Sequence, residues 1–247
     1  MKRVKVLSFI LVAFLIIGIN MNVYASEVYY TTPNGIDLTE EEYKFITVFY
    51  GEQYLKIMTE DQYKEFVDAD LLTKRVTIKK VDLYPNQFGI SPQSNTHSTP
   101  EKTLQIGSAC SSMCYTSILL RWHASPNIRS YDVIGAYFHN VSLIDHNTTY
   151  VYSTAGTEYY NNLKTTSKGI GNTVKLPDKG DDIVVNMMFT NTKNGTIFGS
   201  YQHAMQNTTL LVSQNYEFSL NGHGNVFLFT GNAVDVYDEM TGVDVDV

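Results

Sequence analysis

The stretch GSACSSMCYTSILLRWHAS, residues 107–125, concentrates the residue types that could do chemistry. It holds the only two cysteines and the only tryptophan of the chain, with an arginine and a histidine close behind. A cysteine with a histidine could form a nucleophile and its base, or part of a metal site. In an exported protein, two cysteines more often form a disulfide. The chemistry therefore depends on how these residues are positioned.

We expect Cys110 and Cys114 to form a disulfide. Four residues of extended strand would separate the two by about 13 Å, whereas a disulfide needs Cα atoms roughly 4.4–6.8 Å apart. The bond thus predicts a turn at CSSMC, and Ser111-Ser112 are compatible with one. Free or intermolecular thiols, catalysis and metal binding are the alternatives. No Cys/His zinc pattern accompanies the pair.

Alternation through 113–123 divides this segment into two faces. Thr116, Ile118, Leu120 and Trp122 form the face that we expect in the core, with Trp122 as an anchor. The other face carries Tyr115, Ser117, Leu119, Arg121 and His123 and is expected to form an exposed polar strip. Arg121 and His123 are therefore candidate ligand-binding residues, with a plain solvated surface as the alternative.

A second candidate cluster lies at the end of a predicted strand. Tyr201, Gln202 and His203 bring together side chains that can hydrogen-bond a sugar or a peptide. The alternative is a histidine whose hydrogen bonds are satisfied at a strand end. The sequence shows no helical His pair of the zincin type, no nucleophile elbow and no phosphate-binding glycine loop. No catalytic residue is therefore assigned.

The C-terminal sequence VDVYDEMTGVDVDV predicts a hairpin with valines inward and aspartates outward. Asp235, Asp244 and Asp246 would then share one face and could bind Ca²⁺, which prefers oxygen ligands. The alternative is a charged edge that prevents strands of two molecules from pairing. No other cofactor is indicated.

Residues 1–25 are expected to be a signal peptide. Lys2, Arg3 and Lys5 precede an apolar run, and Val23-Tyr24-Ala25 gives small residues at the two positions that a signal peptidase reads. We therefore expect a secreted protein with no membrane span after cleavage. The whole chain has a net charge of −7, and removing the three basic charges of this leader leaves −10, so an acidic surface argues against nucleic acid as a partner.

The segment 26–84 is expected to form a helical hairpin followed by one strand. Thr39 with Glu42, and Thr59 with Gln62, are capping boxes that predict two helix starts. Gly51 could break the first helix. Residues 85–102, rich in Pro, Ser, Asn and Thr, are expected to form a linker.

Residues 103–247 have the period-two pattern of strands separated by turn signals, which predicts an antiparallel β-sandwich of jelly-roll or Ig-like type. Asn194-Gly195 predicts a hairpin. The fold class is therefore α+β. We expect strands at 103–108, 113–123, 131–143, 149–153, 172–176, 182–190, 196–203, 208–213, 225–230 and 233–237.

The doubled LTEEEY/MTEDQY stretch, with RSYDVIGA and VKLPDKGDDIVV, resembles a group of uncharacterised secreted proteins of Gram-positive bacteria. The resemblance spans most of the chain and implies export, but it implies no activity. A tyrosine-rich sandwich outside the cell separately favours a non-enzymatic extracellular binding module for a cell-surface glycan, a wall polymer or a protein. The alternatives are an extracellular hydrolase with a site assembled from distant residues, and an assembly protein that docks a partner through its N-terminal helices.

Overall fold

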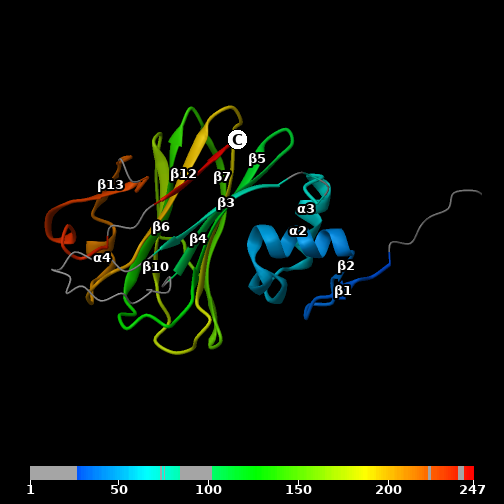
Figure 1. Ribbon diagram of the computed structural model, residues 1–247, viewed down its shortest axis with the longest axis horizontal. Helices are drawn as coiled ribbons and strands as arrows, with labels where there is room; N and C mark the ends of the chain where they lie inside the picture. The colour runs from blue at the N-terminus through cyan, green and yellow to red at the C-terminus, as the bar shows by residue number, and fades with distance from the viewer. Residues whose placement is uncertain (1–26, 73, 75, 84–101, 222–223, 239–241) are drawn as a thin grey trace, which may run out of the picture.

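A computed structural model describes residues 27–72, 74, 76–83, 102–221, 224–238 and 242–247 (Figure 1). The expected signal peptide lies outside the described residues, as does the expected linker except for its last residue. That residue, Lys102, is buried and begins a strand.

Two antiparallel sheets form the centre of the molecule and are consistent with the expected sandwich (Figure 1). The six-stranded sheet has the order β3 (Val76–Leu83), β4 (Lys102–Cys110), β5 (Cys114–Trp122), β11 (Val184–Asn191), β7 (Leu143–Ser153) and β8 (Gly156–Tyr159). The five-stranded sheet has the order β15 (Val243–Asp246), β12 (Thr196–Gln202), β6 (Tyr131–His139), β10 (Gly169–Lys175) and β9 (Leu163–Thr166).

The main core contains apolar side chains from both sheets. Ile118 and Leu120 of β5 belong to it, with Ile134 of β6 and Ile197 of β12. Trp122 is buried there beside Tyr201, with ring centroids 6.4 Å apart, so the prediction of a core tryptophan is confirmed. Alternation along β5 therefore identified its inward face.

Helices cover the outer face of the six-stranded sheet (Figure 1). They are α2 (Glu40–Tyr50), the 3-10 helix η1 (Glu52–Lys56) and α3 (Glu60–Asp68), preceded by the short pair β1 (Tyr30–Thr31) and β2 (Asp37–Leu38). Both predicted capping boxes are present. Gly51, at φ 86°, ends α2, because a positive φ suits glycine and stops the helix.

This helical cover overturns the expected exposed strip on β5. Tyr115, Ser117 and Leu119 are buried beneath the helical segment, and only Arg121 and His123 reach solvent. Alternation shows which residues share a face of the sheet. It does not show whether another element packs on that face and buries it.

A C-terminal cap covers the outer face of the five-stranded sheet (Figure 1). It consists of α4 (Leu210–Ser213), the pair β13 (Tyr216–Phe218) and β14 (Phe227–Phe229), and the 3-10 helix η2 (Gly231–Ala233). The predicted strands at 208–213 and 233–237 are therefore wrong. The hydroxyl of Thr209 accepts a bond from Val212 N, an N-cap that favours a helical turn there.

Asn194-Gly195 forms a turn but not the predicted hairpin, because the two flanking strands belong to different sheets. β11 pairs with β5 and β7, whereas β12 pairs with β6 and β15. The amide groups of Asn194 and Gly195 both donate to Val247 O, at 2.7 and 3.2 Å. The carbonyl of Val247 thus accepts the hydrogen bonds of the turn, and the turn connects β11 in one sheet to β12 in the other.

The C-terminal hairpin is also a wrong prediction. β15 joins the edge of the five-stranded sheet by pairing with β12, and Tyr237 forms an isolated bridge with Ala204. Val243 and Val245 are buried in the main core, so their inward direction was predicted correctly. The strand with which β15 pairs was predicted wrongly.

The disulfide between Cys110 and Cys114 is present at the turn between β4 and β5, with Cα atoms 4.1 Å apart. Because the residues between the two cysteines form a turn, the cysteines lie close enough for the bond despite their short spacing.

We expect Cys110→Ser with Cys114→Ser to lower the free energy of unfolding by only about 2 kcal/mol, because so short a loop removes little unfolded-state entropy. Urea denaturation measures this loss. Thiol titration of the unreduced, unfolded wild type should find no free thiol, and two reactive thiols would contradict the bond.

Candidate functional site

Arg121 and His123 lie in an open groove of about 590 Å³ beside the helical segment. The Arg121 guanidinium donates to Gln53 Oε1 at 2.8 Å. Thr103 Oγ1 donates to Asp82 at 2.7 Å and lies 2.7 Å from His123 Nε2. The structure therefore brings the two predicted residues into one concave surface, with their polar groups engaged by neighbours.

The structure separates the three residues of the second predicted cluster. Tyr201 and His203 are buried between the sheets and the 237–238 segment, while Gln202 lines a cavity beneath the C-terminal cap. They therefore do not form one exposed ligand surface.

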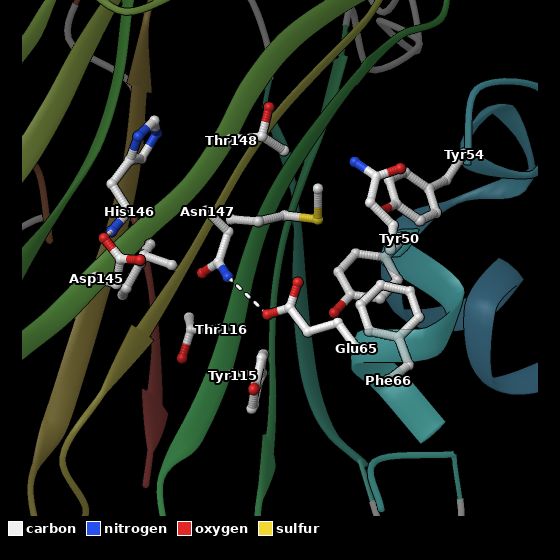
Figure 2. Close-up of a pocket in the computed structure, with 13 residues that line it drawn as sticks. Tyr50, Tyr54, Glu65, Phe66, Tyr115, Thr116, Asp145, His146, Asn147 and Thr148 are labelled. Atoms are coloured by element: carbon white, nitrogen blue, oxygen red, sulfur yellow. Dashed lines mark hydrogen bonds between the residues drawn. The ribbon is translucent and has the colours of Figure 1, made fainter. Parts of the chain in front are cut away.

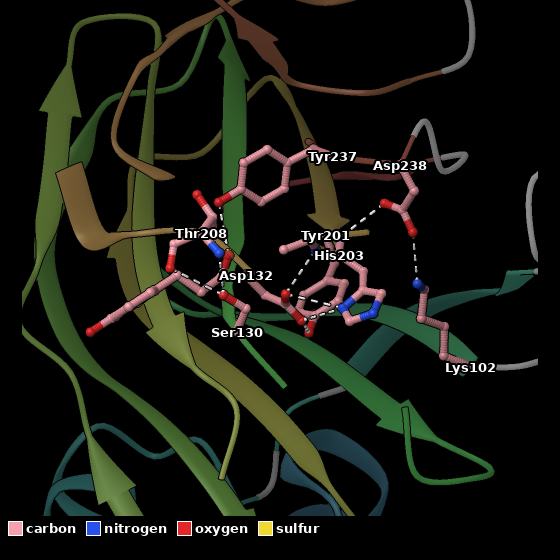
Figure 3. A network of polar contacts seen from close by, with 10 residues as sticks. Lys102, Ser130, Asp132, Tyr201, His203, Thr208, Tyr237 and Asp238 are labelled. Carbon is pink, nitrogen blue, oxygen red and sulfur yellow. Dashed lines mark hydrogen bonds and ion pairs between the residues drawn. The ribbon is translucent and has the colours of Figure 1, made fainter. Parts of the chain in front are cut away.

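Tyr201 and His203 belong to a buried polar network (Figure 3). The Asp132 carboxylate accepts hydrogen bonds from Tyr201 Oη, from His203 Nδ1 at 2.9 Å and from the backbone N of Ala204 at 2.9 Å. Burial, together with the Asp132 carboxylate, raises the pKa of Tyr201, which therefore stays a neutral donor. Asp132 is thus surrounded by donors.

A buried ion pair continues this network (Figure 3). Lys102 Nζ lies 2.9 Å from Asp238 Oδ2 and 4.5 Å from the Trp122 ring centroid, and the amide of His203 donates to Asp238 Oδ1 at 2.8 Å. Burial raises the pKa of the Asp238 carboxyl, although Lys102 opposes the shift. The network joins β4, β6 and the 237–238 segment, so its geometry is that of an internal support.

The three aspartates proposed for calcium are not gathered together. Asp244 pairs with Lys79 at 2.7 Å, Asp246 accepts from Thr196 Oγ1 at 2.8 Å, and Asp235 is exposed after η2. Among the described residues no group of three or more His, Cys, Asp or Glu side chains is placed to hold a metal ion.

A cavity of about 250 Å³ lies between α3 and the strands β5, β7 and β11 (Figure 2). Sequence reasoning did not identify it. Its inner wall is aromatic, and its mouth is polar and acidic. The residues that carry its chemistry are Tyr50, Tyr54, Phe66 and Tyr115 on the wall and Glu65, Asp145, His146 and Asn147 at the mouth.

The aromatic wall is rigidly packed. Tyr50 and Phe66 stack with centroids 5.1 Å apart and planes at 13°, and Tyr54 lies 4.8 Å from Tyr50. Burial raises the pKa of both tyrosines, so their hydroxyls remain protonated. The wall therefore offers π-surface and neutral hydrogen-bonding groups at fixed positions.

Two irregularities of β7 shape the mouth. In its pairing with β11, Met188 lies opposite Thr148 and Phe189 opposite His146, which leaves Asn147 unpaired. A second shift skips Ile144. Such bulges re-aim side chains and are over-represented next to active sites. Here Asn147 Nδ2 donates to Glu65 Oε1 at 3.3 Å, so the bulged strand contacts α3 across the mouth (Figure 2).

The mouth is electrostatically negative. Partial burial, and secondly the nearby Asp145, raises the pKa of the Glu65 carboxyl above its usual range. Burial lowers the pKa of His146, whose Nε2 lies 2.9 Å from Thr149 Oγ1, so the imidazole is neutral at pH 7. Among the described residues, the lining contains two carboxylates and neither lysine nor arginine. A ligand group that is protonated and positively charged best complements this negative mouth.

No family model matches the chain, and no curated protein matches it. Within the described part of the chain, no helix is long and apolar enough to cross a membrane. Function must therefore be argued from the site itself.

Proposed function

We propose that the protein is a secreted, non-enzymatic binding module and that the cavity between α3 and β7 holds its ligand. The double irregularity of β7 carries this proposal, because it turns a regular strand into the wall of a site. The partner is a glycan, wall polymer or protein of a cell surface. The proposed frame is a β-sandwich, jelly-roll or Ig-like, with the N-terminal helices as a hairpin across one face.

The chemistry of the cavity favours a ligand that presents a protonated amine. Aromatic faces attract cations through their quadrupoles, and Tyr50, Tyr54 and Phe66 supply such faces. Glu65 and Asp145 supply negative charge whose mutual repulsion a cation would relieve. An amino sugar or a lysine side chain has this combination of charge and apolar surface.

A glycoside hydrolase is the second candidate, because the raised pKa of Glu65 suits a general acid and Asp145 provides a second carboxylate in the same cavity. In that case Glu65 would protonate the leaving oxygen. Release of reducing sugar from an isolated envelope distinguishes this candidate from simple binding.

The experiment is co-sedimentation of the mature protein with cell envelopes from its producing organism. Wild-type pelleting should saturate with dose, and glucosamine should compete better than glucose because only glucosamine carries an ammonium group. Glu65→Gln should weaken binding about tenfold, equivalent to ~1.4 kcal/mol. Glu60→Gln, an exposed change on the same helix outside the cavity, is the matched control and should bind as wild type.

The same assay has a pH signature. Protonation of Glu65 removes the anion, so wild-type affinity should begin to fall while the pH is still above the usual glutamate value, and Glu65→Gln should lose this component. Equal binding by Glu65→Gln and wild type would exclude the cavity as the site. Pelleting that requires Ca²⁺ would contradict a cavity that binds its ligand without a metal ion.

A further inference from the structure

The open groove of about 590 Å³ that contains Arg121 and His123 is separate from the cavity under α3. Its floor is the outer face of β3, β4 and β5, where Asp82, Thr103 and Arg121 lie in register across the three strands. The end of α2 and the start of η1 form its wall. Among the described residues, none lines both the groove and the cavity, so a ligand of the groove has its own contacts.

The Arg121 guanidinium is held in place but lacks a counter-ion. Gln53 Oε1 accepts from it at 2.8 Å, and Gln53 Nε2 donates to Asp182 Oδ2 at 3.3 Å, so a buried glutamine fixes its position. A guanidinium has five N–H donors. Among the described residues Arg121 uses one of them and forms no ion pair, although its side chain is half-buried. Because burial of a charge is costly without an opposite charge, the free donors favour an anionic group from a ligand.

The hydrogen bonds of Thr103 determine which nitrogen of His123 donates. The Thr103 hydroxyl has one proton, which it donates to Asp82 Oδ1 at 2.7 Å. Its 2.7 Å contact with His123 Nε2 is therefore a hydrogen bond that the Nε2–H group donates. A neutral His123 then has a free lone pair on Nδ1, which can accept a hydrogen bond from an N–H group of a ligand.

The rest of the lining limits the class of ligand. Its two carboxylates, Glu52 and Asp82, balance the two cationic side chains, so the groove suits a single negative charge better than a polyanion. Val48, which is 51% exposed, and Leu119 supply aliphatic surface. No Phe, Tyr or Trp among the described residues lines the groove. An aliphatic side chain therefore fits this surface better than a group that needs an aromatic face.

We propose that the groove binds the C-terminus of a peptide chain. The Arg121 guanidinium donates two parallel hydrogen bonds to the terminal carboxylate, because its planar fork matches the two oxygens. The amide N–H of the last peptide residue donates to His123 Nδ1, and the aliphatic side chain of that residue packs on Val48 and Leu119. Capture of a terminal carboxylate is a recurring mode of peptide recognition. This inference does not depend on the amine site proposed above.

The test is a titration of the ¹⁵N-labelled mature protein with N-acetyl-alanyl-leucine as the free acid. The backbone amide resonances of Gly51 and Leu119, which line the groove, are the readout. The same dipeptide with a C-terminal amide is the matched probe, because it lacks only the negative charge. The free acid should shift both resonances saturably, and the amide should bind about tenfold more weakly or worse, because a hydrogen bond to a charged group is lost.

Two variants separate the guanidinium fork from its charge. Arg121→Lys keeps the positive charge but loses the planar fork, so it should bind the free acid about tenfold more weakly. Lys44→Gln, an exposed change on α2 outside the groove, is the control for the protein's overall charge and should bind as wild type. The comparison of acid with amide uses the wild type alone, so it does not require a variant to fold.

Three results would overturn the proposal: no saturable shift with the free acid, equal affinity for acid and amide, or wild-type affinity in Arg121→Lys. Glucuronate and inorganic phosphate are the competing probes. Tighter binding of either one than of the peptide would assign the groove to an acidic sugar or a phosphate group, and would also overturn it. Glu65→Gln, which is expected to weaken binding in the cavity under α3, should leave this titration unchanged, so the two proposals fail independently.

Discussion

Replacing Lys102 with methionine is expected to lower the free energy of unfolding by about 3–5 kcal/mol, because it leaves the Asp238 carboxylate buried without its counter-ion. The side chains of this pair are 0% and 3% exposed. Water cannot take the place of the ammonium group without opening the structure. Urea denaturation at pH 7 measures the loss.

Two variants make this result specific. Lys102→Met combined with Asp238→Asn removes both charges, keeps an acceptor for the His203 amide, and should recover most of the lost stability. Lys79→Met breaks the exposed pair with Asp244 and should cost less than about 1 kcal/mol. If the free energy of unfolding of Lys102→Met lies within about 1 kcal/mol of the wild-type value, the ion pair does not support the fold as described.

Gly135→Ala is expected to lower the free energy of unfolding. Overpacking usually costs about 1–3 kcal/mol, and we expect the loss here near the upper end of that range. A Cβ at this position of β6 would lie 2.4 Å from Ile170 O and 2.8 Å from Phe227 Cζ. Relieving these contacts would disturb the β6–β10 pairing and would also displace Phe227 of the cap. Differential scanning calorimetry measures the effect.

Gly199→Ala provides the matched control within the same sheet. Its Cβ would meet only the side-chain ends of Ile106 and Ile118, at 3.3 Å, and these can give way. The control should therefore lose less stability than Gly135→Ala. Equal losses would show that the close approach of the β10 backbone and Phe227 to Gly135 is not the cause.

The sequence predicted features that depend on neighbouring residues. Thr39 with Glu42 identified a helix start because a capping box closes within one turn. The Cys110–Cys114 bond was predicted from the expectation of export, because two cysteines of an exported protein usually pair, and the short spacing required a turn between them. The burial of Trp122 followed from alternation along one strand.

The features that were missed depend on distant partners. The local chemistry of Asn194-Gly195 is the same whether the turn joins two paired strands or connects two sheets. Which of the two forms depends on the other strands with which β11 and β12 can pair. Glu65 and Asp145 share a cavity although 80 positions separate them, and the bulge at Asn147 exists only relative to β11. No periodicity along the chain carries that information.

The placement of the two covers on opposite sides of the sheets has a consequence for valency. The helical segment packs on the six-stranded sheet and the cap on the five-stranded sheet, so a ligand held under α3 lies on the opposite side of the sheets from the cap (Figure 1). A ligand in that cavity leaves the surface of the cap free for a second contact. If the cap contacted the same target, the second attachment would be intramolecular, and two weak contacts would give a long residence time.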